Sequence, residues 1–459
     1  MRNRRRSVRW NTMRILAAGF LGVIFLGGVL LWLPVSNQQP IAFIDALFTS
    51  TTAVCVTGLI TITPATQFTL FGKIVLMLLI QIGGLGVVAC MASFFFLLRK
   101  RITVKERIVI QETYNMDRLG GIVGLVKKVI IGTFVVEGAG ALFYAFQFVP
   151  EYGLIKGLGY SIFHAVSAFC NAGIDILGTT SLSVYSANPL VNLTTMALIV
   201  LGGLGFVVWF DILHMIRLTL KRRQSPVSGV VGLNLHTKLV LVMTAVLIFG
   251  GAALIFLMEQ GNPETMKGMS AGEKALSSLF QSVTTRTAGF FTIPQGTLYD
   301  ETKLLCSILM FIGGSPAGTA GGIKTTTMAM LILACLTTVR GGKNIECFGR
   351  KITFENFRTG FAVAMLAMGI FLGGTMLIAV IEADSVSMID IVYETTSAIA
   401  TVGLTADLTP HLERASQVIL MILMYTGRIG PVTLALVFAG KANPKTRLRE
   451  LPGERVMVG

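Results

Sequence analysis

Four short segments of this chain share one pattern of residues. Each has a run of small and hydroxyl-bearing residues, then one glycine, then a large apolar residue. Glycine tolerates backbone conformations that align carbonyl groups, where a Cβ atom would clash. Rings of backbone carbonyl oxygens replace the hydration shell of a cation in selective pores. The segments are TSTTAVCVTGL ending at Gly58-Leu59, HAVSAFCNAGI at Gly173-Ile174, FQSVTTRTAGF at Gly289-Phe290 and ETTSAIATVGL at Gly403-Leu404. Together they predict a four-part ring that binds a cation.

The spacing of the four glycines supports this interpretation. Successive glycines are 115, 116 and 114 residues apart in a chain of 459 residues, and a near-constant period marks a repeated structural unit. One such segment alone would be an ordinary glycine turn at a membrane surface. No two copies agree in the two residues before the glycine, as expected if backbone atoms bind the ion. The expected filter residues are Val56, Thr57, Gly58, Asn171, Ala172, Gly173, Thr287, Ala288, Gly289, Thr401, Val402 and Gly403.

The composition indicates a membrane protein. Hydrophobic residues make up 53% of the chain, charged residues only 13%, and the mean hydropathy is +0.74. Segments of about 20 apolar residues, long enough to span a bilayer, recur twice in each repeat, with the glycine pattern in a shorter re-entrant segment between them. The predicted spans are 14–35, 69–98, 121–149, 189–216, 237–258, 301–338 (interrupted), 357–382 and 415–440.

These spans predict an all-α polytopic membrane protein. Four tandem span–pore-loop–span repeats, with eight transmembrane helices and four re-entrant pore loops, surround a central pseudo-four-fold pore. The expected parts are a basic N-terminus (1–13), repeats over 14–98, 121–216, 237–338 and 357–440, and a C-terminal tail (441–459).

The formal net charge of +15 would suit a nucleic-acid partner, but its distribution favours a membrane. Most Lys and Arg residues fall in the N-terminus, 99–128, 217–238, 340–358 and the tail from Lys441. An even number of predicted spans separates these segments, so all lie on one side. The positive-inside rule then places both termini in the cytoplasm of a protein of the cell membrane.

Each pore loop is expected to begin as a short helix whose negative C-terminal end points at the cation. Asp45 and Asp390, each 13 residues before a glycine, are predicted to be N-caps. Ser270 and Glu273 have the spacing of a capping box in the third copy.

The second span of the third repeat reads GGSPAGTAGGIKTTT over 313–327. Five glycines and a proline disfavour a regular helix, and irregular backbone at membrane depth must line a cavity or be buried in protein. The segment is interpreted as a gate across the pore, the alternative being a kinked helix without a gating role. The expected gate residues are Gly313, Gly314, Ser315, Pro316, Ala317, Gly318, Thr319, Ala320, Gly321, Gly322 and Lys324, with Arg428 from the last span.

Charged residues within predicted spans are functional candidates. Arg428 is expected either to hold the 313–327 segment through its carbonyls or to pair with Asp211 or Glu137. Lys324 would repel a cation if it projected into the pore. Arg286 is expected to brace the third loop from behind, with Glu394 as a candidate partner.

Other classes of function have weaker support. The six cysteines and four histidines show no metal-site spacing, and no cluster of His, Cys, Asp or Glu suggests an enzyme. Five cysteines fall in predicted membrane segments and are expected to pack as small apolar residues. A secondary transporter would normally show inverted repeats with an odd number of spans per unit. A pore with Na⁺ selectivity, or with poor selectivity, remains a variant of the pore hypothesis.

The four repeats, TRTAGF in the third loop, the glycine-rich break and Arg428 together resemble the Trk/Ktr/HKT superfamily of potassium transporters. The resemblance covers essentially the whole chain and is strongest to the bacterial Ktr-type membrane subunit. It implies K⁺ as the permeant ion, a homodimer, a cytosolic nucleotide-binding ring that responds to ATP and ADP, and Na⁺ as a candidate activator. In plant relatives a serine at the first filter position accompanies Na⁺ transport, so Gly58 favours K⁺. No segment resembles the nucleotide-binding subunit, and no organic cofactor or nucleic acid is expected on this chain.

Overall fold

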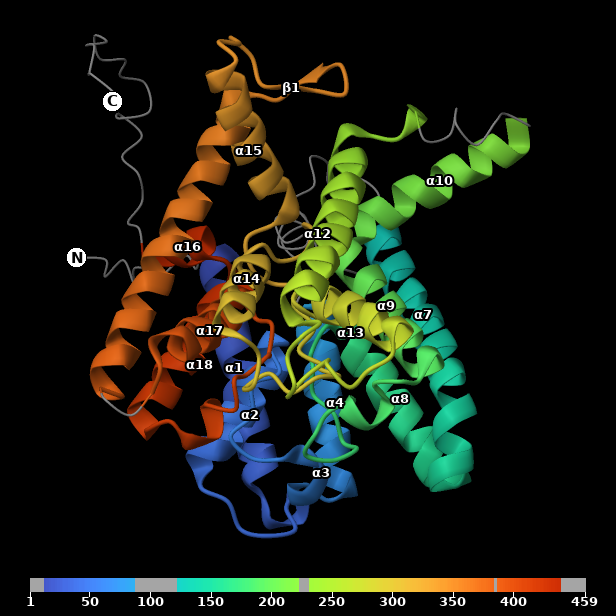
Figure 1. Ribbon diagram of the computed structural model, residues 1–459, viewed down its shortest axis with the longest axis vertical. Helices are drawn as coiled ribbons and strands as arrows, with labels where there is room; N and C mark the ends of the chain where they lie inside the picture. The colour runs from blue at the N-terminus through green and yellow to red at the C-terminus, as the bar shows by residue number, and fades with distance from the viewer. Residues whose placement is uncertain (1–11, 87–121, 223–230, 384–385, 439–459) are drawn as a thin grey trace, which may run out of the picture.

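The computed structural model is mostly helical and describes residues 12–86, 122–222, 231–383 and 386–438 (Figure 1). Within these residues, four helices are long and apolar enough to cross a bilayer without interruption: α1 (Thr12–Trp32), α7 (Ile122–Tyr152), α12 (Leu235–Glu259) and α16 (Phe354–Ile381). Only 22–33% of the residues in their most apolar windows are buried. Most of this apolar surface therefore faces outward, as lipid-facing helices require.

Each long helix is followed by a short helix that ends just before a glycine of the repeated pattern. These are α2 (Phe43–Cys55), α8 (Leu154–Cys170), α13 (Ala271–Thr284) and α17 (Met388–Ala400). Each packs against the long helix that precedes it. Their C-terminal halves are buried, whereas 13 to 17 residues at 1.5 Å each give only about 20–26 Å of helix, which is too short for a span.

A second apolar segment follows each short helix, and all four are interrupted or end early. They comprise α4 (Leu70–Leu85), α9 (Pro189–Leu204) with α10 (Phe206–Arg222), α14 (Asp300–Phe311) with α15 (Thr325–Val339), and α18 (Arg414–Ile429) with α19 (Pro431–Phe438). Three end at a glycine with positive φ: Gly86 (84°), Gly205 (87°) and Gly430 (95°). The glycine clusters that the sequence marks thus coincide with breaks.

The prediction of one uninterrupted span over 189–216 is wrong, because α9 and α10 meet at 97°. A side chain at Gly205 would strike the carbonyl oxygen of Pro316, so the bend is occupied by another segment of backbone. The predicted span 415–440 is likewise divided at Gly430. Residues 87–98 of the span predicted over 69–98 lie outside the described residues.

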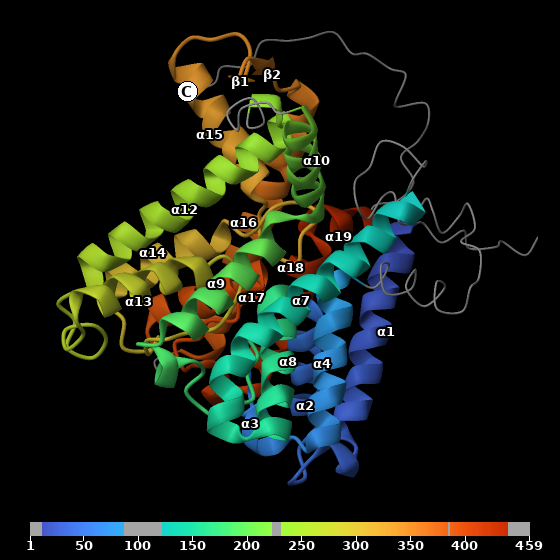
Figure 2. The same ribbon diagram turned by 90° about the vertical axis from the view of Figure 1, so that its right-hand side faces the viewer.

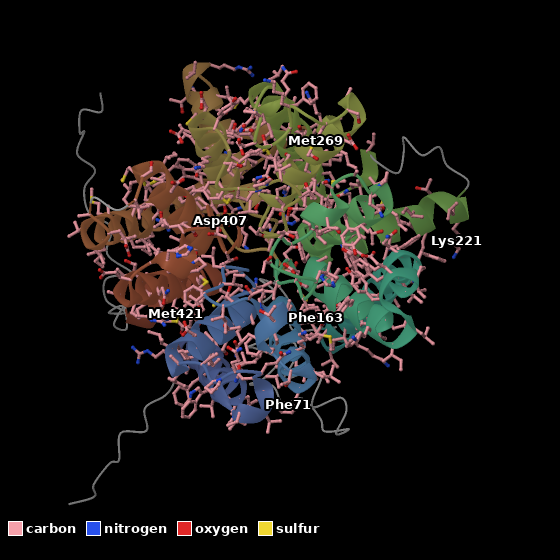
Figure 3. The ribbon with its side chains drawn as sticks, turned by 60° about the horizontal axis from the view of Figure 1, so that its bottom comes forward. Phe71, Phe163, Lys221, Met269, Asp407 and Met421 are labelled. Carbon is pink, nitrogen blue, oxygen red and sulfur yellow. The ribbon has the colours of Figure 1, made fainter. Side chains whose placement is uncertain are left out.

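The four groups of helices close into a ring. In each group the second helix packs against the short helix of the next: α4 on α8, α9 on α13, α14 on α17, and α18 back on α2. Figure 3 shows these groups arranged in chain order around the centre of the molecule. Figure 2 shows α10 and strands β1 (Glu346–Cys347) and β2 (Arg350–Lys351) at one end of the molecule and α3 (Pro64–Gln67) at the other. The remaining elements are the 3-10 turns η1 (Pro34–Ser36), η2 (Ser183–Tyr185) and η3 (Thr409–His411).

The two aspartates predicted as N-caps lie one turn inside their helices. The N-caps are Ala42 and Ser387, so Asp45 and Asp390 occupy the third helical position. Each carboxylate instead joins two groups of helices, because Asp45 pairs with Arg414 of α18 at 2.5 Å and Asp390 pairs with Lys303 of α14 at 2.7 Å. The N-cap prediction is therefore wrong, because partners on neighbouring helices hold these carboxylates.

The capping box predicted for α13 is confirmed. The Ser270 hydroxyl accepts a hydrogen bond from the Glu273 N–H, and the Glu273 carboxylate accepts one from the Ser270 N–H. These bonds favour the ionised acid and lower the pKa of Glu273 below its usual value.

Three of the cysteines, Cys55, Cys170 and Cys306, are buried as expected of small apolar residues. Cys335 is exposed, unlike this expectation. Cys347, in β1, is partly exposed and packs against the buried cluster of Leu239, Ala329 and Ile352. Cys90 lies outside the described residues.

Candidate functional site

The four glycines of the repeated pattern meet at the centre of the ring of helices. A Cβ atom built on Gly58 would lie 2.7 Å from the carbonyl oxygen of Ala172, and one on Gly173 would lie 2.5 Å from that of Ala288. Each glycine therefore faces the backbone of the next copy at a distance that excludes a side chain.

The same contacts continue through the other two copies and close the cycle. A Cβ on Gly289 would lie 2.6 Å from the carbonyl oxygen of Val402, and one on Gly403 would strike the carbonyl oxygen of Thr57. The third copy is thus joined to the fourth and the fourth to the first. Four segments spread over 345 residues (403 − 58) form one ring of backbone, which we call the glycine ring (Gly58, Gly173, Gly289 and Gly403).

The residue two positions before each ring glycine has left-handed backbone geometry. The φ angles are 55° at Val56, 61° at Asn171, 68° at Thr287 and 53° at Thr401. Such geometry is disfavoured for β-branched residues and is found where the surrounding structure imposes it. Because four different sequences reach one conformation, the loop geometry dictates it and the residue type does not.

Hydroxyl groups within the small-residue runs hold the ring segments. The N–H of Gly58 donates to the Thr52 hydroxyl at 2.9 Å, and the N–H of Gly403 donates to the Ser397 hydroxyl at 3.0 Å. In the second copy the Ser167 hydroxyl donates to the carbonyl of the residue after the glycine, Ile174, at 2.6 Å. Thr284 makes the corresponding bond in the third copy.

Sequence reasoning missed these positioning residues. The shared signal is a hydroxyl six residues before the glycine in three copies and five residues before it in the third. The runs of small residues by themselves indicate only close helix packing.

Oxygen atoms are the donors that the ring region offers. The buried hydroxyls of Thr57, Thr287 and Thr401 have no hydrogen-bond partner within the part of the chain that the structure describes. No three His, Cys, Asp or Glu side chains gather as a metal ligand set among the described residues. Hydroxyl and carbonyl oxygens suit a hard, weakly bound cation better than a tightly held transition metal.

A glycine-rich loop (residues 312–324) connects α14 to α15 and packs against the ring. Thr325 to Thr327, which the sequence placed in the irregular segment, belong to the first turn of α15. A side chain at Gly321 would strike the Thr401 hydroxyl, and one at Gly322 would lie 3.4 Å from Ala400. The loop thus lies directly against the fourth ring segment.

The break between α9 and α10 holds the other side of this loop. Ser315 and Thr319 donate backbone hydrogen bonds to the carbonyls of Gly203 and Gly202, at 2.9 and 3.2 Å. Phe206, the first residue of α10, donates to the carbonyl of Ala317 at 3.0 Å. The carbonyls of Gly202 and Gly203 and the N–H of Phe206 would pair within a continuous helix. At this break they form hydrogen bonds with the loop instead.

Arg428 joins three elements at this level. Its guanidinium donates to the carbonyl of Thr319 in the glycine-rich loop and to the carbonyls of Gly83 and Gly84 in α4. Of the two expected arrangements, the structure has the hydrogen bonds to carbonyls. Asp211 instead accepts from Thr237 at 2.6 Å near the start of α12. Lys324 turns back into its own loop, donating to the carbonyl of Ala320 at 2.7 Å.

The expected pairing of Arg286 with Glu394 is wrong. Glu394 accepts hydrogen bonds from the N–H of Ala406 at 3.1 Å and from the Thr409 hydroxyl at 2.9 Å. Its carboxylate thereby fixes the segment that follows the fourth ring glycine and is not available to the arginine. One guanidinium nitrogen of the buried Arg286 has no partner among the described residues.

A buried amide network, also missed from the sequence, links the third and fourth segments. Gln281 of α13 donates to Gln295 at 2.6 Å, and the Tyr393 hydroxyl of α17 donates to the same oxygen of Gln295 at 2.7 Å. Gln295 in turn donates to the carbonyl of Ile293 at 2.7 Å. Fully satisfied buried networks of this kind rigidify their surroundings.

Comparison with known proteins agrees with this architecture. A family model described as "TrkH: Cation transport protein" matches residues 7–447. The chain is 39% identical over 432 residues to Ktr system potassium uptake protein B of Bacillus subtilis, covering 94% of both chains. It is 37% identical over 455 residues to potassium/sodium uptake protein NtpJ of Enterococcus hirae, covering 98% of both. The crystal structure of the potassium transporter TrkH from Vibrio parahaemolyticus shares the fold, with a TM-score of 0.73 at 16% identity over 95% of this chain and 87% of that one.

The chain is therefore a cation transport protein of the Trk/Ktr superfamily. Within that superfamily it belongs with the bacterial Ktr-type membrane subunits. It is a multi-pass membrane transporter and not an enzyme.

Proposed function

We propose that this chain carries K⁺ into the cell through a channel-like pore whose selectivity filter is the glycine ring. The closed cycle of contacts through Gly58, Gly173, Gly289 and Gly403 carries the proposal, because it brings four backbone segments to one axis. Relatives named as potassium uptake proteins support K⁺ as the ion.

In this proposal each copy supplies the ring glycine and the two residues before it to the filter. The left-handed residue turns the chain from a short helix into the filter segment, and the hydroxyl bonds then hold that segment. Carbonyl groups that are held in position by these hydrogen bonds can replace the hydration shell of K⁺. The C-terminal ends of α2, α8, α13 and α17 add partial negative charge near the ion.

We propose that the glycine-rich loop is the gate. The expected gate residues, Gly313 to Gly322 and Lys324, belong to a loop that contacts the fourth ring segment and the first residue of α10. Arg428 holds this loop against α4. Opening requires the loop to leave its bonds with the α9–α10 break and with Arg428. The free energy needed to exchange a few hydrogen bonds is small enough for a regulatory partner to open or close the gate.

The orientation follows from the basic segments. Arg217 and Lys221 of α10, and Arg350 and Lys351 of the β-hairpin, belong to elements at one end of the molecule (Figure 2). By the positive-inside rule this end faces the cytoplasm, with both termini.

For partners, we propose a homodimer in the lipid bilayer that docks a cytosolic ring regulated by ATP and ADP. The name "Ktr system" of the relatives supports a multi-component assembly. The name of the Enterococcus relative, potassium/sodium uptake protein, supports Na⁺ as an activator or co-ion. The proposal includes no organic cofactor on this chain and no nucleic acid.

Growth of a bacterial strain without K⁺ uptake systems tests the proposal. The chain, expressed with the cytosolic partner encoded by its own organism, should restore growth at low external K⁺. A Gly403→Ala variant at equal membrane abundance should not. Failure of the wild-type chain to restore growth, or equal growth with both chains, would contradict the proposal.

A further inference from the structure

A cavity of about 520 Å³ lies at the seam between the first and second groups of helices. It is bounded by α4, α8 and the residues that join α3 to α4. Figures 1 and 2 show α3 at one end of the molecule. We call it the α4–α8 cavity. The residues that line it are Gln38, Phe68, Thr69, Leu70, Lys73, Ile74, Met77, Ile155, Lys156, Gly159, Tyr160, Ile162, Phe163 and Ile176. Two lysines and no acidic residue occur in this set.

The corresponding position at two other seams holds an ion pair. Lys303, in the first turn of α14, pairs with Asp390 of α17, and Arg414, the first residue of α18, pairs with Asp45 of α2. Both aspartates lie 13 residues before their ring glycine. A cation on the second helix and an acid on the next short helix thus join neighbouring groups.

At the α4–α8 seam the cation is present but the acid is not. Lys73 lies in the first turn of α4, and Tyr160 is the residue 13 positions before Gly173. The Lys73 ammonium donates to the carbonyl of Ala65 at 2.8 Å. Lys156, exposed near the start of α8, adds a second positive charge to the same cavity. The seam therefore carries an excess of positive charge where its counterparts are neutral.

Apart from Gln38, Thr69 and Tyr160, the rest of the lining is apolar or glycine. Leu70 and Ile155 are 77% and 87% exposed at its rim, and Ile74 is 45% exposed along its wall. Phe163 and Ile176 are almost fully buried at its floor. Two lysines beside a mostly apolar cavity on a membrane protein match the two parts of a phospholipid.

We propose that the α4–α8 cavity binds an anionic glycerophospholipid. Its phosphate lies between Lys73 and Lys156, taking the place of the missing carboxylate, and an acyl chain lies along Ile74 and Ile162. Charge complementarity selects an anionic headgroup over a zwitterionic one. Because Ile176 is three residues after Gly173, the lipid also supports the outer side of the second ring segment.

Native mass spectrometry of the purified full-length chain tests this site. Dioleoyl phosphatidylglycerol and dioleoyl phosphatidylcholine, which share acyl chains, would be titrated separately. We expect one tight phosphatidylglycerol site per chain that phosphatidylcholine does not fill. Lys73→Gln with Lys156→Gln should weaken that site about 30-fold, since each lysine near an anionic lipid contributes roughly a factor of five.

Two further variants separate the site from general effects of charge or folding. Lys267→Gln with Lys274→Gln removes the same charge from the α12–α13 connection and the first turn of α13, and should leave the tight site unchanged. Tyr160→Asp gives Lys73 the carboxylate found at the other seams and should weaken phosphatidylglycerol binding without removing a lysine. Equal binding of the two lipids by the wild type, or a double Lys73/Lys156 variant that keeps the tight site, would overturn the proposal. Loss of a dimer in that variant with lipid binding unchanged would assign the cavity to a second copy of the chain and also overturn it.

Discussion

The Gly289→Ala substitution adds one methyl group to the glycine ring. The new Cβ would lie 2.6 Å from the carbonyl oxygen of Val402 and 3.0 Å from the Cα of Gly173. Both neighbours are backbone atoms, so no flexible side chain can move aside. Gly289 also has a φ of 85°, which an alanine rarely adopts.

The size of the effect follows from these distances. Ordinary van der Waals contact begins at 3.4 Å, so the Val402 carbonyl must move by about 0.8 Å, or the backbone at position 289 must adopt a different φ. Residual backbone strain would be about 1–3 kcal/mol. A carbonyl displaced this far no longer matches its three counterparts around the ion. We expect the preference for K⁺ over Na⁺ to fall by at least about tenfold, equivalent to about 1.4 kcal/mol.

The assay is inhibition of tracer rubidium uptake by K⁺ and by Na⁺ in proteoliposomes that contain equal amounts of folded protein. Gly369→Ala is the matched control, because that position lies within α16 and a Cβ there meets no atom within 4 Å. The control should keep the wild-type ratio of inhibition constants. A Gly289→Ala protein that elutes as the wild type and keeps that ratio would refute the assignment of the glycine ring as the filter.

Two other substitutions and one deletion probe the gate and the hydrogen bonds that hold the filter segments. Arg428→Gln removes charge-assisted bonds to the glycine-rich loop, each of about 1.5–3 kcal/mol, and should raise rubidium flux several-fold in the absence of a regulatory partner. Deletion of residues 318–320 should raise flux further and make it insensitive to that partner. Ser397→Ala leaves the buried N–H of Gly403 without its acceptor, which costs about 1–3 kcal/mol, and should lower K⁺ preference without raising flux.

The two substitutions have control variants that remove a similar group at an exposed position. Arg414→Gln removes an arginine from the first turn of α18, where its side chain is 55% exposed and pairs with Asp45, and flux should not change. Thr359→Ala removes a hydroxyl exposed on α16 and should leave selectivity intact. Flux that rises equally in Arg428→Gln and Arg414→Gln would indicate a general loss of stability and argue against a specific role of Arg428 in holding the gate closed. Unaltered flux in the deletion variant at normal membrane abundance would remove the gate hypothesis.

The even spacing of the glycines was the feature of the sequence that best predicted the candidate site. It located four positions that the structure brings into mutual contact, because a glycine is required where two backbones meet. The conformation two residues earlier was not predictable, since Val56, Asn171 and Thr287 share no property that favours a positive φ. That geometry is imposed by the closure of the ring, which is a long-range effect.

The breaks in the second helices show a different limit. A Gly-Gly-x-Gly pattern fits close helix packing as well as a turn, so the sequence predicted a continuous span through Gly205. The decisive partner is Pro316, more than 100 residues away, whose carbonyl occupies the bend. Asp45 illustrates the same point, because its N-cap preference is a local property whereas its ion pair with Arg414 depends on tertiary contact.

Tracer rubidium uptake by proteoliposomes that contain this chain alone tests most directly whether the glycine ring is a K⁺-selective filter. The variant that lacks residues 318–320 is used, so that a closed gate cannot mask the pore. Unlabelled K⁺, Na⁺ and NH₄⁺ would be added as competitors. We expect saturable uptake that K⁺ inhibits at concentrations at least tenfold lower than Na⁺. Uptake that K⁺ and Na⁺ inhibit equally, or no uptake above empty liposomes, would refute the assignment of the glycine ring as the filter.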